Sequence, residues 1–222
     1  MHNNNTAPLA GSAEELLNRT PPPLALADYV RDGWRLFIAN PVPHIAYTAV
    51  MLLILLVAGW VPIIGQLLVM ALAALLLGAL YRALGKQMAG GPVSASDYLE
   101  VLNDPLPLVL LSIVSSILIG IGFLLLLLPG IYLSVAYLFA VPLVVFYRLE
   151  FWTGLETSRK LITRQWFTYF ILLVIITVLN MIGAAVFFIG LLITLPLSAA
   201  IVLTAFAHQL GLPQPPLAIE QR

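Results

Sequence analysis

Residues 105–147 read PLPLVLLSIVSSILIGIGFLLLLLPGIYLSVAYLFAVPLVVFY and contain no Asp, Glu, Lys or Arg. A charged side chain is costly at the centre of a bilayer, so a long stretch without one is typical of a segment that lies in lipid. Two further stretches, 36–81 and 165–219, are also free of these residues. Because one helical crossing needs about 20 apolar residues, each stretch is long enough for two crossings. The pattern predicts an all-α polytopic membrane protein with six transmembrane helices in three hairpins.

The composition of the chain excludes an ordinary soluble domain. Such a domain has about 25% charged residues, whereas this chain has 9% charged and 61% hydrophobic residues. The formal net charge is zero and no basic patch is evident, which argues against a nucleic-acid partner. The chain has no cysteine, so disulfides, cysteine-based metal sites and thiol nucleophiles are excluded. Membrane lipids are therefore the expected partners.

Proline and glycine divide each charge-free stretch near its middle, as expected for a turn between two helices. The turns are predicted at Trp60-Val61-Pro62, at Leu128-Pro129-Gly130 and near Gly190. We expect spans at about 43–60, 63–81, 106–127, 131–147, 167–188 and 191–209, all within one domain over 24–210. The polar, Pro-rich segments 1–23 and 211–222 are predicted to be flexible tails. The alternative to full spans is three re-entrant wedges whose apolar turns stay inside the bilayer.

The distribution of Lys and Arg predicts the orientation. All 10 Lys and Arg residues lie outside the expected hairpins, and the turns contain none. Cytoplasmic segments of membrane proteins are enriched in these residues. We therefore expect both termini and both long loops in the cytoplasm. No short apolar core followed by a small-residue cleavage site occurs near the start, so no cleaved signal peptide is predicted.

A short amphipathic segment precedes each hairpin, at 26–39, 94–102 and 153–165. Such segments are typical of interfacial helices that lie along the membrane surface. Their similar spacing from the turns indicates one unit used three times in parallel orientation. The pattern also predicts local contacts: ion pairs Asp28–Arg31, Asp32–Arg35 and Glu156–Lys160, and capping boxes Ser94–Asp97 and Thr153–Glu156.

The third amphipathic segment contains a basic stripe formed by Arg159, Lys160 and Arg164. Cations next to a membrane attract the phosphates of lipid head groups, so these residues are candidate contacts for lipid phosphates. The alternative is that the three amphipathic helices only anchor the hairpins. Both interpretations place the stripe at the cytoplasmic surface.

Few polar groups lie within the expected spans. Gln66 and Asn180 are the strongest, and each is a candidate intramembrane polar contact, either holding helices together or lining a substrate path. Pro142 and Pro196 lie inside spans, where each removes a backbone hydrogen bond and is expected to kink its helix. The histidines of the domain, His44 and His208, are expected at the cytoplasmic interface. Nothing resembles a nucleotide-binding loop, a catalytic triad or a metal motif, so no cofactor is predicted.

The second half of the chain resembles a known family in three segments, 129–133 (PGIYL), 139–145 (FAVPLVV) and 152–160 (WTGLETSRK). These resemble a bacterial superfamily of six-helix inner-membrane proteins, related to the membrane domain attached to some glycerophosphodiester phosphodiesterases. Residues 189–196 (IGLLITLP) are similar to its later signature. The resemblance implies a multi-pass protein of the bacterial inner membrane, and it implies no catalytic residues. The last span ends in Ala207-His208-Gln209, where many relatives have a tyrosine.

Together these features favour an integral inner-membrane protein without catalytic activity. It would act through helix packing and contacts with lipid or protein, in a scaffold or envelope-related role, with a membrane-protein partner or a second copy as further candidate partners. The alternative is a transporter or channel for a small neutral or apolar solute. A lipid-handling enzyme would require an acidic or histidine pair at the interface.

Overall fold

The computed structural model describes residues 12–19, 25–62 and 64–213, and all regular structure in these residues is helical. The predicted tails lie outside the described residues except at 12–19 and 211–213. The helices are α1 (Ala13–Asn18), α2 (Leu26–Ala39), α3 (Pro41–Gly59), α4 (Gly65–Met88), α5 (Ala95–Leu99), the 3-10 helix η1 (Glu100–Asn103), α6 (Leu106–Leu125), α7 (Leu127–Ala136), α8 (Ala140–Tyr147), α9 (Phe151–Thr163), α10 (Trp166–Ala185) and α11 (Leu191–Leu210).

Six helical segments are long and apolar enough to cross a membrane: α3, α4, α6, the α7–α8 segment, α10 and α11. This confirms the all-α class and the six apolar spans. Most boundaries lie within about three residues of the prediction, and two differ by more. The turn after α6 lies at Leu126 instead of 128–130, because Pro129 and Gly130 fit within the first turn of α7, where a missing N–H costs little. In addition, α4 continues past 81 to Met88.

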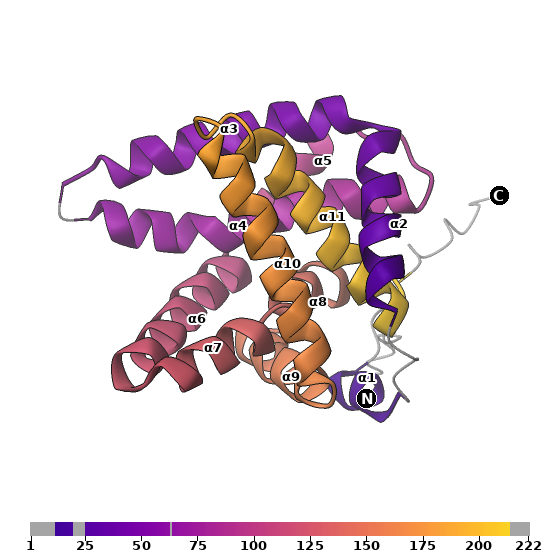
Figure 1. Ribbon diagram of the computed structural model, residues 1–222, viewed down its shortest axis with the longest axis vertical. Helices are drawn as coiled ribbons and strands as arrows, with labels where there is room; N and C mark the ends of the chain where they lie inside the picture. Colours follow the sequence, from indigo (N-terminus) through magenta and orange to yellow (C-terminus); the bar gives the residue numbers. More distant parts are fainter. Residues whose placement is uncertain (1–11, 20–24, 63, 214–222) are drawn as a thin grey trace, which may run out of the picture.

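Helix α11 forms the centre of the molecule, and every residue from 196 to 206 is buried. It packs against α2, α3, α4 and α10, as expected for a helix that is apolar on all sides. Helix α2 approaches it so closely that a Cβ atom at Gly33 would lie 2.6 Å from Ile201 Cα. In Figure 1 the α3–α4 and α6–α7 pairs extend away from α11 in different directions, and α10 runs beside it.

A glycine approaches the backbone of the neighbouring helix near each of the three turns. A Cβ atom at Gly65 would lie 2.9 Å from Gly59 O, and one at Gly122 would lie 2.9 Å from Gly130 Cα. At the third turn, a Cβ atom at Gly190 would lie 2.7 Å from Gly183 Cα. Small residues let helix backbones come this close in membrane proteins. The sequence contains these glycines, but only the structure shows that they meet in pairs.

The span from 127 to 147 is broken between α7 and α8, one turn before Pro142. Proline has no N–H and its ring crowds the carbonyl four residues earlier, so the break follows the predicted kink. The buried Ser158 of α9 repairs the break. Its hydroxyl donates to Ala136 O at 2.7 Å and accepts from the Phe139 N–H at 3.1 Å. Helix α11, by contrast, continues through Pro196.

Part of the predicted N-terminal tail is structured. Helix α1 contacts α9, and its Leu16 is fully buried. Arg19 donates to Leu210 O, the carbonyl at the end of α11, which also accepts from the Tyr147 hydroxyl at 3.0 Å. These contacts lie within the segment 1–23, for which the sequence predicted a flexible tail. The segment is polar in composition, and the sequence did not indicate that Leu16 is buried or that Arg19 caps the end of α11.

Local contacts at the amphipathic helices follow the prediction with one exception. The ion pairs form at 2.7, 3.9 and 3.4 Å for Asp28–Arg31, Asp32–Arg35 and Glu156–Lys160. The capping box at Ser94 is present. The one at Thr153 is not, because α9 begins earlier, at Phe151, which places Thr153 inside the helix.

The glycine contacts predict that a Gly→Ala change lowers the stability of the protein at a helix contact and raises it at an open position. Gly190→Ala places a methyl group against the Gly183 backbone, and overpacking of this kind costs about 1–3 kcal/mol. A Cβ atom at Gly120, on α6, meets nothing within 4 Å, so Gly120→Ala should gain up to about 1 kcal/mol of helix stability. Thermal unfolding in detergent micelles should show a lowered midpoint for the first variant only. Equal shifts in both would contradict the contact.

The repair of the α7–α8 break is testable by a double-mutant cycle. Ser158→Ala leaves the Phe139 N–H and Ala136 carbonyl without their buried partner, at a cost of about 1–3 kcal/mol in the free energy of unfolding. In a Pro142→Ala background the helix can continue, so Ser158→Ala should cost less there. An identical cost in both backgrounds would show that Ser158 does not compensate for the proline.

Candidate functional site

The predicted basic stripe lines an open cavity between α1 and α9. Arg159, Lys160, Thr163 and Arg164 come from α9 and the loop after it, and Leu17 comes from α1; the cavity has a volume of about 360 Å³. We refer to it as the basic pocket. Helical spacing brings the three cations to one side of α9, so the structure places all three predicted residues at one site.

One carboxylate partly neutralises the basic pocket. Glu156 accepts from Arg159 Nε at 2.8 Å and Nη2 at 2.7 Å, and Lys160 Nζ lies 3.4 Å from it. The Arg159 hydrogen bonds lower the pKa of Glu156, and the same bonds raise the pKa of Arg159. Three cations face a single carboxylate, so the pocket keeps a net positive charge that can attract an anion.

Arg164 has a structural contact that the sequence did not indicate. Its guanidinium donates to the backbone carbonyls of Leu17 and Arg19, at the end of α1. A cation at a helix C-terminus satisfies carbonyls that have no partner within the helix. Arg164 therefore holds α1 in place, and Arg159 and Lys160 are the more available cations of the pocket.

Asn180 and Gln66, the two predicted intramembrane polar residues, have different surroundings in the structure. Asn180 Nδ2 donates to Ser198 Oγ at 3.0 Å, which joins α10 to α11. Gln66 is exposed near the start of α4, and among the described residues no hydrogen bond joins its side chain to another group. The structure thus gives Asn180 a partner across a helix interface and does not bring it together with Gln66.

A buried polar network around His44 was missed by the sequence reasoning. Gln87 donates through Nε2 to Leu36 O, so its Oε1 accepts from His44 Nε2 at 2.7 Å. His44 Nδ1 then accepts from the Tyr98 hydroxyl at 2.8 Å. These contacts join α3 and α4 to α2 and α5. His44 is fully buried with both ring nitrogens satisfied, which is a structural role.

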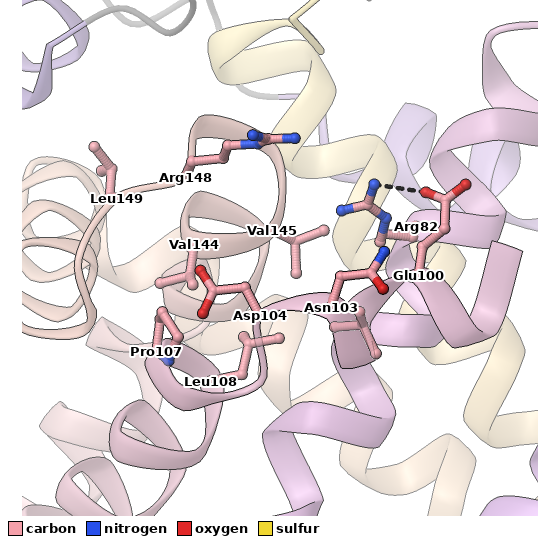
Figure 2. A pocket seen from close by; sticks show the side chains of 11 residues that line it. Arg82, Glu100, Asn103, Asp104, Pro107, Leu108, Val144, Val145, Arg148 and Leu149 are labelled. Atoms are coloured by element: carbon pink, nitrogen blue, oxygen red, sulfur yellow. Dashed lines mark hydrogen bonds and ion pairs between the residues drawn. The ribbon is translucent and has the colours of Figure 1, made fainter.

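A second cavity, of about 220 Å³, lies where α4, η1, α6 and α8 meet. We call it the rim cavity. Its charged and amide side chains are Arg82, Glu100, Asn103, Asp104 and Arg148, and its apolar lining includes Pro107, Leu108, Val144 and Val145. Arg82 and Glu100 form an ion pair at 2.6 Å. Figure 2 shows the Arg148 and Arg82 guanidinium groups pointing toward one another across the cavity.

None of the rim-cavity residues was predicted as a site residue. A partial signal was present, because Arg82, Asp104 and Arg148 are three of the six charged residues that border the charge-free stretches. Comparisons with protein-family models, curated proteins and solved structures found no match to this chain. Function is therefore inferred from the geometry of the two cavities and the charges around them.

Proposed function

We propose that the chain is a non-catalytic integral protein of the bacterial inner membrane that acts through helix packing and contacts with lipid, in a scaffold or envelope-related role. The observation that carries the proposal is the basic pocket, where three cations line an open cavity beside an amphipathic helix and Glu156 pairs with two of them. A phosphate ester in the cytoplasmic leaflet is the anion that such a pocket would meet. The resemblance of 129–160 to a bacterial inner-membrane superfamily supports the location.

The proposed topology has three hairpins that open toward the cytoplasm, with both termini on that side. It is supported by the contrast between the two ends of the spans. The turns expose large apolar side chains, with Trp60, Leu124 and Phe187 at 82%, 86% and 89% exposure. The Lys and Arg residues lie at the opposite ends, where the positive-inside tendency places the cytoplasm.

Transport of a neutral solute has less support. The rim cavity and the basic pocket are both lined by charged residues, and neither is lined by Gln66 or Asn180. Asn180 bonds to Ser198 between two packed helices, which favours the interpretation of Asn180 as a packing contact.

Cysteine labelling tests the topology. Because the chain has no native cysteine, only the introduced residue can react. Trp60→Cys, Leu126→Cys and Phe187→Cys should react with a membrane-impermeant maleimide in intact spheroplasts, because the turns would reach the far surface. Arg35→Cys, on an exposed position of α2, should react only after permeabilisation. Re-entrant wedges would instead leave all three turn positions unlabelled.

Removal of two pocket cations should weaken retention of anionic lipid. Each Lys or Arg near a membrane surface contributes about 1 kcal/mol of attraction, so Arg159→Ala with Lys160→Ala should lose roughly thirtyfold in affinity for phosphatidylglycerol. Arg164 is left in place because it holds α1. Native mass spectrometry of the protein from nanodiscs measures the retained lipid.

Two further variants make this test specific. Arg31→Ala with Arg35→Ala removes the same charge from α2 and should leave retention nearly unchanged. Glu156→Gln should raise retention, because it releases Arg159 and Lys160 from their carboxylate partner. Since the pKa of Glu156 lies below its ordinary value of 4.5, the same release by protonation should occur only below that pH. Equal loss in the Arg159/Lys160 and Arg31/Arg35 variants would contradict a pocket-specific contact.

A further inference from the structure

We propose that the rim cavity binds the zwitterionic head group of a phosphatidylethanolamine lipid, with its phosphate at Arg148 and Arg82 and its ammonium group at Asp104. The proposal rests on the function proposed above, since it assumes contact with the cytoplasmic leaflet. It concerns a different cavity from the basic pocket, with different elements and a different charge balance.

The position of the rim cavity matches the depth of lipid head groups. Arg82 follows the first charge-free stretch, and Asp104 and Arg148 border the second on either side. These three boundaries between charged and charge-free sequence, far apart along the chain, converge on one cavity. Because charged residues cannot enter the hydrocarbon without a large cost, their boundary marks the interface between hydrocarbon and head groups.

The charges of the cavity fit a ligand that carries both signs. Arg82 is paired with Glu100. Among the residues that the structure describes, neither Arg148 nor Asp104 has an ion-pair partner within 4.0 Å. Arg148 is thus available for a phosphate, and Asp104 for an ammonium group. In Figure 2 the Asp104 carboxylate points away from Arg82, toward Val144, so the two signs are presented at different parts of the cavity.

The backbone at Arg148 has a conformation that is unusual for a residue with a side chain. This residue ends α8 in the left-handed region, with φ 51° and ψ 33°. Glycine is the common residue at such a helix end, and other residues are disfavoured there by about 1–2 kcal/mol. Strained positions often accompany functional side chains. A guanidinium that points into a cavity from this position therefore supports a binding role.

The remaining lining suits the part of a lipid below its head group. Pro107 and Leu108 from α6 and Val144 and Val145 from α8 form the apolar wall, and α6 and α8 belong to segments that can span a membrane. An uncharged glycerol backbone would meet this wall while the head group stays with the charged residues. The cavity has two cations and two carboxylates, so a purely anionic lipid would leave Asp104 without a partner and would face Glu100.

The test measures preference between two lipids. The full-length protein is placed in nanodiscs with equal amounts of phosphatidylethanolamine and phosphatidylglycerol, and native mass spectrometry counts the lipids that remain bound. Arg148→Gly removes the guanidinium and keeps the backbone conformation that glycine favours, so this variant should fold. Arg148→Gly and Asp104→Asn should each reduce the retention of phosphatidylethanolamine on the order of tenfold. Arg35→Gln, which removes an exposed cation on α2, should not.

The outcomes separate this inference from the proposed function. Unchanged phosphatidylethanolamine retention in both cavity variants would overturn the inference, even if the Arg159/Lys160 variant still loses phosphatidylglycerol. Loss of phosphatidylethanolamine in Arg148→Gly with no effect in the Arg159/Lys160 variant would support the rim cavity and contradict the basic pocket. A titration of the protein in detergent distinguishes the source of the ligand. Binding of soluble glycerophosphoethanolamine or inorganic phosphate as tightly as the lipid would overturn the lipid assignment.

Discussion

The cost of placing a charge in hydrocarbon is the constraint on which the rest of this structure depends. It excludes Asp, Glu, Lys and Arg from three long stretches and gathers them at the ends of the apolar helices. Because the same few segments must hold every charge, basic and acidic residues from distant parts of the chain become neighbours there. The basic pocket and the rim cavity both result from this crowding. The polar groups of both cavities are therefore concentrated near the ends of the apolar helices.

The same physical cost acts on backbone groups inside the molecule. Where Pro142 interrupts a span, the N–H of Phe139 and the carbonyl of Ala136 have no partner within the helix, and both are satisfied by Ser158 from α9. At the end of α11, the carbonyl of Leu210 accepts from the side chains of Tyr147 and Arg19. An unpaired backbone group costs several kcal/mol in an apolar medium. These side chains therefore join the amphipathic helices and α1 to the apolar helices, in addition to the apolar packing around α11.

Prediction from the sequence succeeded at most contacts that depend on one local rule, with the Thr153 capping box as the exception. The Ser94 capping box and the α2 ion pairs depend only on helical spacing, and they form as expected. The sequence did not indicate contacts between residues that are distant along the chain. The segment over 13–19 has a polar composition, and only its contacts with α9 and α11 explain its order. Similarly, nothing in the sequence near His44 indicates that Gln87 and Tyr98 are its hydrogen-bond partners. For the candidate site, the three cations of the basic stripe and the Glu156–Lys160 pair were predicted, whereas the Arg159–Glu156 contact and the role of Arg164 were not.

By itself, the sequence determined the helical class, the number of apolar spans and the side of each span on which charges collect. These follow from the transfer cost of single residues and from helix length, which need no knowledge of packing. The tertiary structure alone decided which helix becomes the buried centre, which glycines meet and which charged residues share a cavity. Such choices depend on the close approach of surfaces far apart along the chain. The convergence of Arg82, Asp104 and Arg148 is of this kind, because each borders an apolar stretch but only the packing of α4, α6 and α8 brings the three together.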